Sequence, residues 1–305
     1  MNKVVTMQEA VSKYVKSGST LFIGGMQHGE SFAAVHEILR QKIDHLTTVA
    51  CLSMSISLLI GEGRVDTMLT GYYGQDLNRT YWLARAKEKG WYPTFVEYSH
   101  FGIAQALLAG QMGVPYLPVR CQVGSDMLKY NPNIKVIDDP FTPGAKIGAV
   151  KAIVPDVGIL HVQRCDADGN AQRWGSMGVD VEGINASRTV IITTEKIVSS
   201  DVIRRDPNRT VIPGYRVNAV VEQPWGAHPM HFAGCYNGDW PGFLAELGNE
   251  EGYDSYMRDF VYGTKDFNEV LALRRAVKGE EYFDRLKIDP VPSEPIYSGY
   301  QELAK

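Results

Sequence analysis

The stretch LFIGGMQHGE, residues 21–30, joins a short apolar run to two glycines and then to polar side chains. Glycine loses more backbone entropy on folding than other residues, so Gly24 and Gly25 indicate either a tight backbone path or a ligand close to the main chain. A helical pattern, SFAAVHEILRQK (31–42), follows directly. Strand-to-helix turns bind ligands in open α/β sheets, and their N–H groups can face an anion. A tight turn that only packs fits the spacing equally well.

Strand-like and helix-like segments alternate on both sides of this turn. Before it, Thr6 and Glu9 form a capping box that opens a helix ended by Gly18. Further helices are expected at 31–42, 80–90, 101–113 and 253–276, and strands at 20–23, 46–53, 66–73, 114–120, 134–138, 146–150, 157–162, 189–194 and 217–222. This alternation predicts an α/β protein with an open, mostly parallel sheet and flanking helices. We assign residues 1–250 to that domain and residues 251–305 to a C-terminal helix and an extended tail.

Composition narrows the class of protein. The chain has 305 residues, of which 44% are hydrophobic and 22% charged, as in ordinary globular proteins. A net charge of -4 argues against a nucleic-acid partner. The N-terminus lacks the uninterrupted apolar core of a signal peptide, and ISLLI (56–60) is far too short to cross a bilayer. We therefore expect a cytoplasmic protein with no membrane partner.

Common cofactor and catalytic motifs are missing from the sequence. The glycine pair is not part of a GxGxxG or Walker A motif, and neither GxSxG nor HExxH occurs. His228 and His231, in GAHPMH (226–231), could share a metal ion, but no carboxylate motif accompanies them. We expect no metal site and no permanently bound cofactor.

Six stretches, in a fixed order over nearly the whole chain, carry a resemblance to a known family. They are LFIGG (21–25), LIGEGRV (59–65), VPYLPVR (114–120), IDDPFTPGAKIGAV (137–150) with VGILHVQRCDADGNAQRWG (157–175), SSDVIRRDPNRTVIPGYRVNAVV (199–221) and PWGAHP (224–229). Together they resemble the A (α) subunits of class I CoA-transferases, and that of glutaconate CoA-transferase in particular.

The resemblance implies a reaction and a partner. In this family a glutamate of the B (β) subunit, within a Ser-Glu-Asn-Gly motif, attacks an acyl-CoA and becomes a glutamyl-CoA thioester, from which a carboxylic acid takes the CoA. That motif is absent here, so the nucleophile is expected on a separate B subunit. Coenzyme A is then a substrate, and the expected assembly is α2β2 or larger.

The resemblance also places the glycine pair near the CoA and acyl groups, where backbone N–H groups could stabilise an oxyanion. The candidate binding residues are Gly24, Gly25, Met26, Gln27, His28, Ser53, Gln75 and His228. For several of them a structural role is an equal alternative: hydrogen bonding for His28, a cap or turn for Ser53 and Gln75, and the subunit interface for His228.

The chain departs from the family pattern beside the glycines. Met26 replaces a phenylalanine, and Glu30-Ser31 stands where a basic residue and a proline are usual. A basic residue would suit the second carboxylate of a dicarboxylic substrate. We therefore expect a more apolar or aromatic acyl group, or a substrate carboxylate held by Arg64 or Arg79.

Two other functions stay open. A related branch hydrolyses a carbon–carbon bond in ring-derived CoA esters, and there Glu97, three residues before His100, would be the acid or base. The alternative for Glu97 is that it only caps the following helix. The more remote function is a small-molecule sensor domain, although no helix-turn-helix segment is evident.

Overall fold

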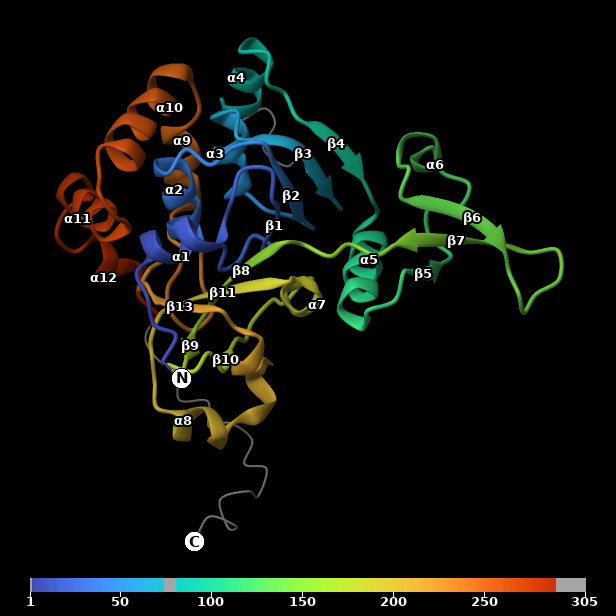
Figure 1. Cartoon of the computed structure of the whole chain (residues 1–305). Coiled ribbons are helices and arrows are strands. Elements are labelled where there is room, and N and C mark those ends of the chain that lie inside the picture. The colour runs from blue at the N-terminus through green and yellow to red at the C-terminus, as the bar shows by residue number, and fades with distance from the viewer. Residues whose placement is uncertain (1, 74–80, 289–305) are drawn as a thin grey trace, which may run out of the picture.

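The computed structural model describes residues 2–73 and 81–288 and is built around one seven-stranded sheet (Figure 1). Its strand order is β13-β11-β8-β1-β2-β3-β4, and every neighbouring pair is parallel. The strands are β1 (Thr20–Ile23), β2 (Leu46–Ala50), β3 (Val65–Thr70), β4 (Thr94–Glu97), β8 (Val157–Val162), β11 (Thr189–Thr194) and β13 (Ala219–Glu222). The predicted open, mostly parallel α/β sheet is confirmed.

Strand order reverses at the centre of this sheet. From β1 the chain moves outward in one direction through β2, β3 and β4, whereas β8, β11 and β13 extend from β1 in the other. The loops that leave β1 and β8 at their carboxyl ends therefore diverge, and such a switch point opens a crevice for ligands. Residues 24–30, which connect β1 to α2, lie at this point.

Helices cover both faces of the sheet, and the side chains alternate accordingly. In β1, Leu21 and Ile23 pack into the core under α1, α2 and α3, while Phe22 points to the opposite core under α5 and α7. The helices are α1 (Met7–Tyr14), α2 (Phe32–Arg40), α3 (Ile56–Gly61), α4 (Trp82–Glu88), α5 (His100–Met112), α6 (Met127–Tyr130), α7 (Asp180–Ala186), α8 (Ser200–Arg205), α9 (Trp240–Glu246), α10 (Glu250–Tyr256), α11 (Phe267–Lys278) and α12 (Tyr282–Leu286).

Two smaller antiparallel sheets flank the main one. Strands β5 (Tyr116–Val119), β7 (Lys146–Lys151) and β6 (Ile134–Asp138) form, with α6, an arm that projects from the body beyond α5 (Figure 1). Strands β9 (Arg164–Cys165), β10 (Ala171–Gln172) and β12 (Thr210–Ile212) form the second sheet. The arm supplies one wall of a pocket beside β4.

Several local predictions are tested by these boundaries. The capping box of Thr6 and Glu9 is present at the start of α1. That helix ends at Tyr14, not at Gly18, which lies in the following turn with φ +82. The expected C-terminal helix over 253–276 is divided into α10, a π-helical stretch (Met257–Tyr262) and α11. Strand β4 was not predicted.

The C-terminal helices pack on the main body. Phe243 of α9, Tyr253 of α10 and Phe267 of α11 belong to the same buried cluster as Leu21 and Ile38. The division at residue 250 stays a prediction, and the proline-rich tail lies outside the described residues. Within the described part of the chain, no helix combines the length and apolar character needed to cross a bilayer.

Candidate active site

The two glycines after β1 are held tightly by the protein itself. The Gly24 N–H donates to the Ile159 carbonyl at 2.9 Å, and the Gly25 N–H donates to Oδ1 of Asp180 at 2.6 Å. Neither amide is available to a ligand in this conformation, so the prediction that they face one is wrong. The oxyanion role implied by the resemblance does not fit these two groups.

Close packing explains why both positions are glycine. Gly25 has φ +112, and a Cβ there would lie 2.4 Å from Cγ of Glu30. A Cβ on Gly24 would lie 2.4 Å from Cδ1 of Leu160. Real side chains do not make contacts this short, so these contacts support the tight turn that packs.

A buried ion pair holds the loop that follows β1 in place. Nη2 of Arg173 lies 2.7 Å from Oδ2 of Asp180, and both side chains are at most 1% exposed. Nη2 also donates to the His28 carbonyl at 2.9 Å, and Nη1 donates to the carbonyls of Gly29 and His161. Such extra hydrogen bonds offset part of the cost of removing the two charges from water, although Nε of Arg173 has no hydrogen-bond partner among the described residues. This network therefore specifies the path of residues 24–29.

His28 is also held inside the protein. It is 3% exposed, and its Nε2 accepts a hydrogen bond from the Ala233 N–H at 3.0 Å. Burial, reinforced by the positive charge of Arg173, lowers the pKa of His28 to about 4. The imidazole is thus neutral near pH 7, and its hydrogen bond matches the structural alternative for this residue. Met26 and Gln27, at the outer part of the loop, stay predictions as substrate contacts.

The loop after β2 is joined to the glycine loop by a carboxylate. Oε2 of Glu30 accepts hydrogen bonds from Oγ of Ser53 at 2.7 Å, from the Met54 N–H at 2.8 Å and from the Ser55 N–H at 2.7 Å. Ser53, predicted as a substrate contact, uses its hydroxyl proton in this bond. The carboxyl ends of β1 and β2 are therefore connected through one buried side chain.

Glu97 lies at the end of edge strand β4 with its side chain exposed. The following helix is capped instead by Ser99, whose Oγ accepts from the Gly102 N–H at 2.9 Å. The alternative interpretation, that Glu97 only caps this helix, is therefore wrong. No hydrogen bond or ion pair joins the Glu97 carboxylate to another described residue, which leaves it available to a ligand.

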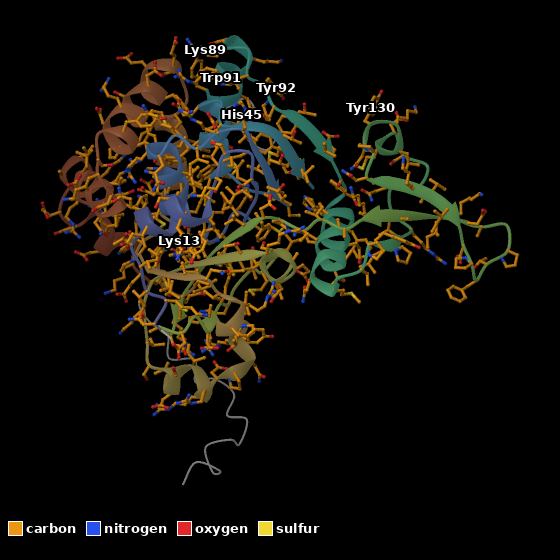
Figure 2. The ribbon with its side chains drawn as sticks, in the orientation of Figure 1. Lys13, His45, Lys89, Trp91, Tyr92 and Tyr130 are labelled. Carbon is orange, nitrogen blue, oxygen red and sulfur yellow. The ribbon has the colours of Figure 1, made fainter. Side chains whose placement is uncertain are left out.

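A pocket of about 580 Å³ opens beside Glu97, between β4 and α6. Phe95, Met127 and the 81%-exposed Tyr130 give it apolar walls, and Asp126 adds a second carboxylate that pairs with Lys129 at 2.6 Å. Figure 2 shows Tyr130 on α6, across from the strand. The pocket suits an uncharged or apolar group more than an anion.

Two other predicted residues, His228 and Arg64, do not join this edge. His228 is 2% exposed, and its ring packs edge-on against Tyr282 with ring centroids 5.7 Å apart; burial lowers its pKa to about 3. Arg64 directly precedes β3 and so lies at the amino edge of the sheet, opposite the loops after β1 and β2; its role with a substrate carboxylate stays a prediction. Gln75 and Arg79 lie outside the described residues.

Sequence reasoning missed a polar network beside the loop. Nε2 of His161 lies 2.7 Å from Oε1 of Glu195, which also accepts from the Tyr236 hydroxyl at 2.8 Å. Nδ1 of His161 lies 2.8 Å from the Thr193 hydroxyl, which is 3.1 Å from that of Ser31 at the start of α2. The parallel register of β8 and β11 brings these groups together. Residues in separate segments give no local signal of such pairing.

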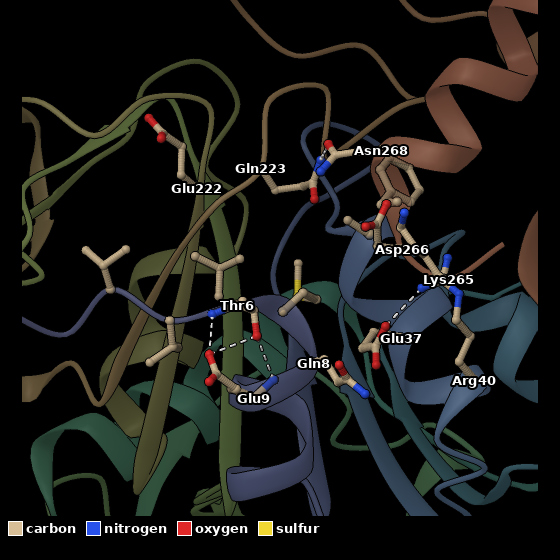
Figure 3. A pocket seen from close by; sticks show the side chains of 16 residues that line it. Thr6, Gln8, Glu9, Glu37, Arg40, Glu222, Gln223, Lys265, Asp266 and Asn268 are labelled. Atoms are coloured by element: carbon tan, nitrogen blue, oxygen red, sulfur yellow. Dashed lines mark hydrogen bonds and ion pairs between the residues drawn. The ribbon is translucent and has the colours of Figure 1, made fainter.

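A second pocket, of about 620 Å³, lies between the N-terminal segment, α2 and α11 (Figure 3). Its cations are already paired: Nη1 of Arg40 lies 3.0 Å from Oε2 of Glu37, and Nζ of Lys265 lies 2.8 Å from Oε1 of Glu269. We therefore assign no binding role to it. Residues 2–73 and 81–288 contain no group of three histidine, cysteine, aspartate or glutamate side chains placed to hold a metal ion.

Comparison with known proteins gives a consistent answer. The family model for coenzyme A transferases matches residues 4–223. The A subunit of the 3-oxoadipate CoA-transferase of Pseudomonas knackmussii is 35% identical over 280 residues, which cover 89% of this chain and 98% of that protein. The A subunit of the glutaconate CoA-transferase of Acidaminococcus fermentans is 34% identical over 298 residues, covering 89% of this chain and 91% of that protein.

The structural comparison agrees with the sequence comparison. The crystal structure of glutaconate coenzyme A-transferase from Acidaminococcus fermentans matches with a TM-score of 0.84, covering 94% of this chain and 96% of that chain. A cholesterol ring-cleaving hydrolase subunit of Mycobacterium tuberculosis is more distant, at 25% identity over 278 residues, covering 87% of this chain and 94% of that protein.

Replacing Asp180 by Asn tests the buried pair. The amide can still accept from Gly25, but Arg173 is left as an uncompensated buried charge, so the free energy of unfolding should fall by about 3–5 kcal/mol. Urea denaturation of the full chain measures this. Asp201→Asn is the control, because the Asp201–Arg204 pair is 72% exposed on both sides and should contribute nothing measurable. Equal effects from the two variants would contradict the account.

Acid should destabilise the protein partly through His28. Between pH 6.5 and about 4 the unfolded chain binds a proton at this residue that the folded protein does not, so stability is lost as the pH falls. Through His28 alone, the free energy of unfolding should fall by about 2 kcal/mol from pH 7 to pH 5. The His28→Asn variant should lack this part of the decrease.

Urea denaturation at the two pH values gives the difference for each variant. His45→Asn is the matched control: Asp66 raises the pKa of this exposed histidine, so removing it should not lessen the acid loss. An unchanged acid loss in His28→Asn would show that His28 does not resist protonation in the folded state.

Proposed function

Because this chain belongs to the coenzyme A transferase family, we propose that it is the A (α) subunit of a heteromeric enzyme that moves CoA between a CoA thioester and a free carboxylic acid. The observation that carries this proposal is the 34–35% identity, over nearly the whole chain, to the A subunits of two CoA-transferases. A cytoplasmic α2β2 assembly, or a larger one, with a B subunit is part of the proposal.

The proposed reaction needs a nucleophile that this chain does not supply. The carboxylate of a B-subunit glutamate attacks the thioester carbonyl and expels the CoA thiolate, leaving a mixed anhydride. The thiolate then attacks the glutamyl carbonyl, which releases the first acid and forms the glutamyl-CoA thioester. The acceptor acid takes the CoA by the same steps in reverse. The Ser-Glu-Asn-Gly motif expected around that glutamate is absent here.

This chain would contribute a preformed wall at the carboxyl edge of its sheet. Its loop 24–30 is fixed by Asp180 and Arg173, and residues 53–55 are fixed by Glu30. A rigid wall lowers the cost of orienting the thioester for attack. Because the amides of Gly24 and Gly25 are already used, an oxyanion donor from this chain would have to be another group.

The substrate proposed here has an apolar or aromatic acyl group. Two relatives are named for dicarboxylic acids, glutaconate and 3-oxoadipate. In this chain the pocket beside β4 carries Glu97 and Asp126, and the neighbouring cation of Lys129 is already paired with Asp126. A second substrate carboxylate would meet like charge there, whereas Phe95 and Tyr130 favour an uncharged group.

A specific observation keeps a second function in view. The Glu97 carboxylate has no partner among the described residues and lines a pocket, an arrangement that suits an acid or base in a ring-opening hydrolysis. The similarity to a cholesterol ring-cleaving hydrolase subunit supports this alternative, although at only 25% identity.

Borohydride trapping separates the two reactions. The chain, co-purified with its B subunit, is incubated with an acyl-CoA and then treated with borohydride, which reduces a glutamyl-CoA thioester to an alcohol. Tryptic mass spectrometry should find one B-subunit glutamate converted, with transfer activity lost in parallel. A B subunit with that glutamate replaced by Gln is the control and should stay unmodified.

The Glu97→Gln variant of this chain distinguishes the transferase from the hydrolase. Under the transferase proposal it should keep transfer activity within a few-fold, because the nucleophile is elsewhere. An unmodified complex that still consumes a CoA ester with water, and loses this activity by about 10²-fold or more in Glu97→Gln, would contradict the transferase and support the hydrolase.

A further inference from the structure

Glu30 is a fully buried carboxylate surrounded by hydrogen-bond donors. Its side chain is 0% exposed, and no described cation pairs with it. Oε2 accepts from Oγ of Ser53 and from the N–H groups of Met54 and Ser55 at 2.7–2.8 Å, and Oε1 lies 3.1 Å from the Met54 N–H. Each of these described contacts comes from a donor, so an acceptor oxygen satisfies them. Burial raises the pKa of Glu30, and the same donors oppose this by stabilising the carboxylate.

The same side chain packs directly against Gly25. A Cβ on that glycine would lie 2.4 Å from Cγ of Glu30 and 2.9 Å from its Cα. The N–H of Gly25 is meanwhile held by Asp180 from another side. One residue thus contacts the loop after β1 through its carbon atoms and the loop after β2 through its oxygen atoms.

We propose that Glu30 is a positioning residue of the CoA-transfer site, an internal anion that holds the carboxyl ends of β1 and β2 at a fixed separation. The inference rests on the proposed function, because the two loops border the proposed thioester site. Without the carboxylate, two amides and a hydroxyl lose their acceptor in a buried place. The loops then move, and the thioester is no longer aligned with the B-subunit glutamate.

Asp166 is a matched control within the same chain. It is 1% exposed and accepts from the N–H groups of Asp168 and Asn170, from Nδ2 of Asn170 and from Oγ of Ser200. It therefore resembles Glu30 in its low exposure and in its donors, although its hydrogen bonds are only partly buried. It lies in the turn between β9 and β10, in a different part of the fold from the glycine loop.

The experiment compares Glu30→Ala, Glu30→Gln and Asp166→Ala, each in complex with the B subunit. Glu30→Ala should lower kcat for CoA transfer at least tenfold and change KM less than threefold. Formate, which can refill the vacated anion position, should restore kcat and the melting temperature in a saturable way. Formamide, of similar size and able to accept but without a charge, should restore less. Asp166→Ala should lower the melting temperature and leave kcat unchanged.

Glu30→Gln keeps the volume, and its amide oxygen can stand at Oε2, where the three donors converge, but it removes the negative charge and puts an NH₂ at the Oε1 position, 3.1 Å from the Met54 nitrogen. Hydrogen bonds to a neutral acceptor are weaker, so kcat should also fall, though less than in Glu30→Ala. A Glu30→Gln enzyme with normal kcat, or rescue by formamide equal to that by formate, would overturn the proposal. If Glu30→Ala does not fold, the Glu30→Gln kinetics decide. If the wild-type complex transfers no CoA, the proposed function fails, while a formate-dependent rise in the melting temperature of Glu30→Ala still establishes the internal anion.

Discussion

The buried pair between Arg173 and Asp180 is the interaction on which the candidate site depends. Removing its two charges from water is costly. This cost is offset in part because both side chains also form hydrogen bonds with the loop after β1. The pair therefore does more than stabilise the core. Arg173 directly follows β10, and Asp180 is the first residue of α7. The pair therefore links these two elements to a loop at the centre of the sheet.

Two carboxylates approach the same glycine from different sides, and this fixes the geometry of the switch point. Asp180 accepts the Gly25 N–H, while the side chain of Glu30 fills the space where a Cβ would be. The loops after β1 and β2 are thereby held by groups of the protein itself. The proposed reaction, with its several acyl intermediates, would benefit from such a wall, because each step could reuse the same alignment.

Much of the fold was predictable, because the sheet gives periodic local signals. Apolar runs, helical spacing and turn residues located most strands, and the capping box of Thr6 located the first helix. Strand β4 was missed because its four residues, TFVE, are only partly buried at a sheet edge and give a weak pattern. The glycine pair was recognised, but its role was not: the partner of Gly25, Asp180, lies 155 residues away. Nor did local reasoning show that Ser99 rather than Glu97 caps α5.

Hydrogen–deuterium exchange of the ligand-free complex tests most directly whether the site is preformed. Peptides that contain residues 24–30 and 53–55 are followed by mass spectrometry, with and without a CoA ester. The account predicts slow exchange of the Gly25, Met54 and Ser55 amides before ligand is added, and little further slowing afterwards, because each is already bonded to a buried carboxylate. Fast exchange in the free protein that slows only with the CoA ester would contradict it.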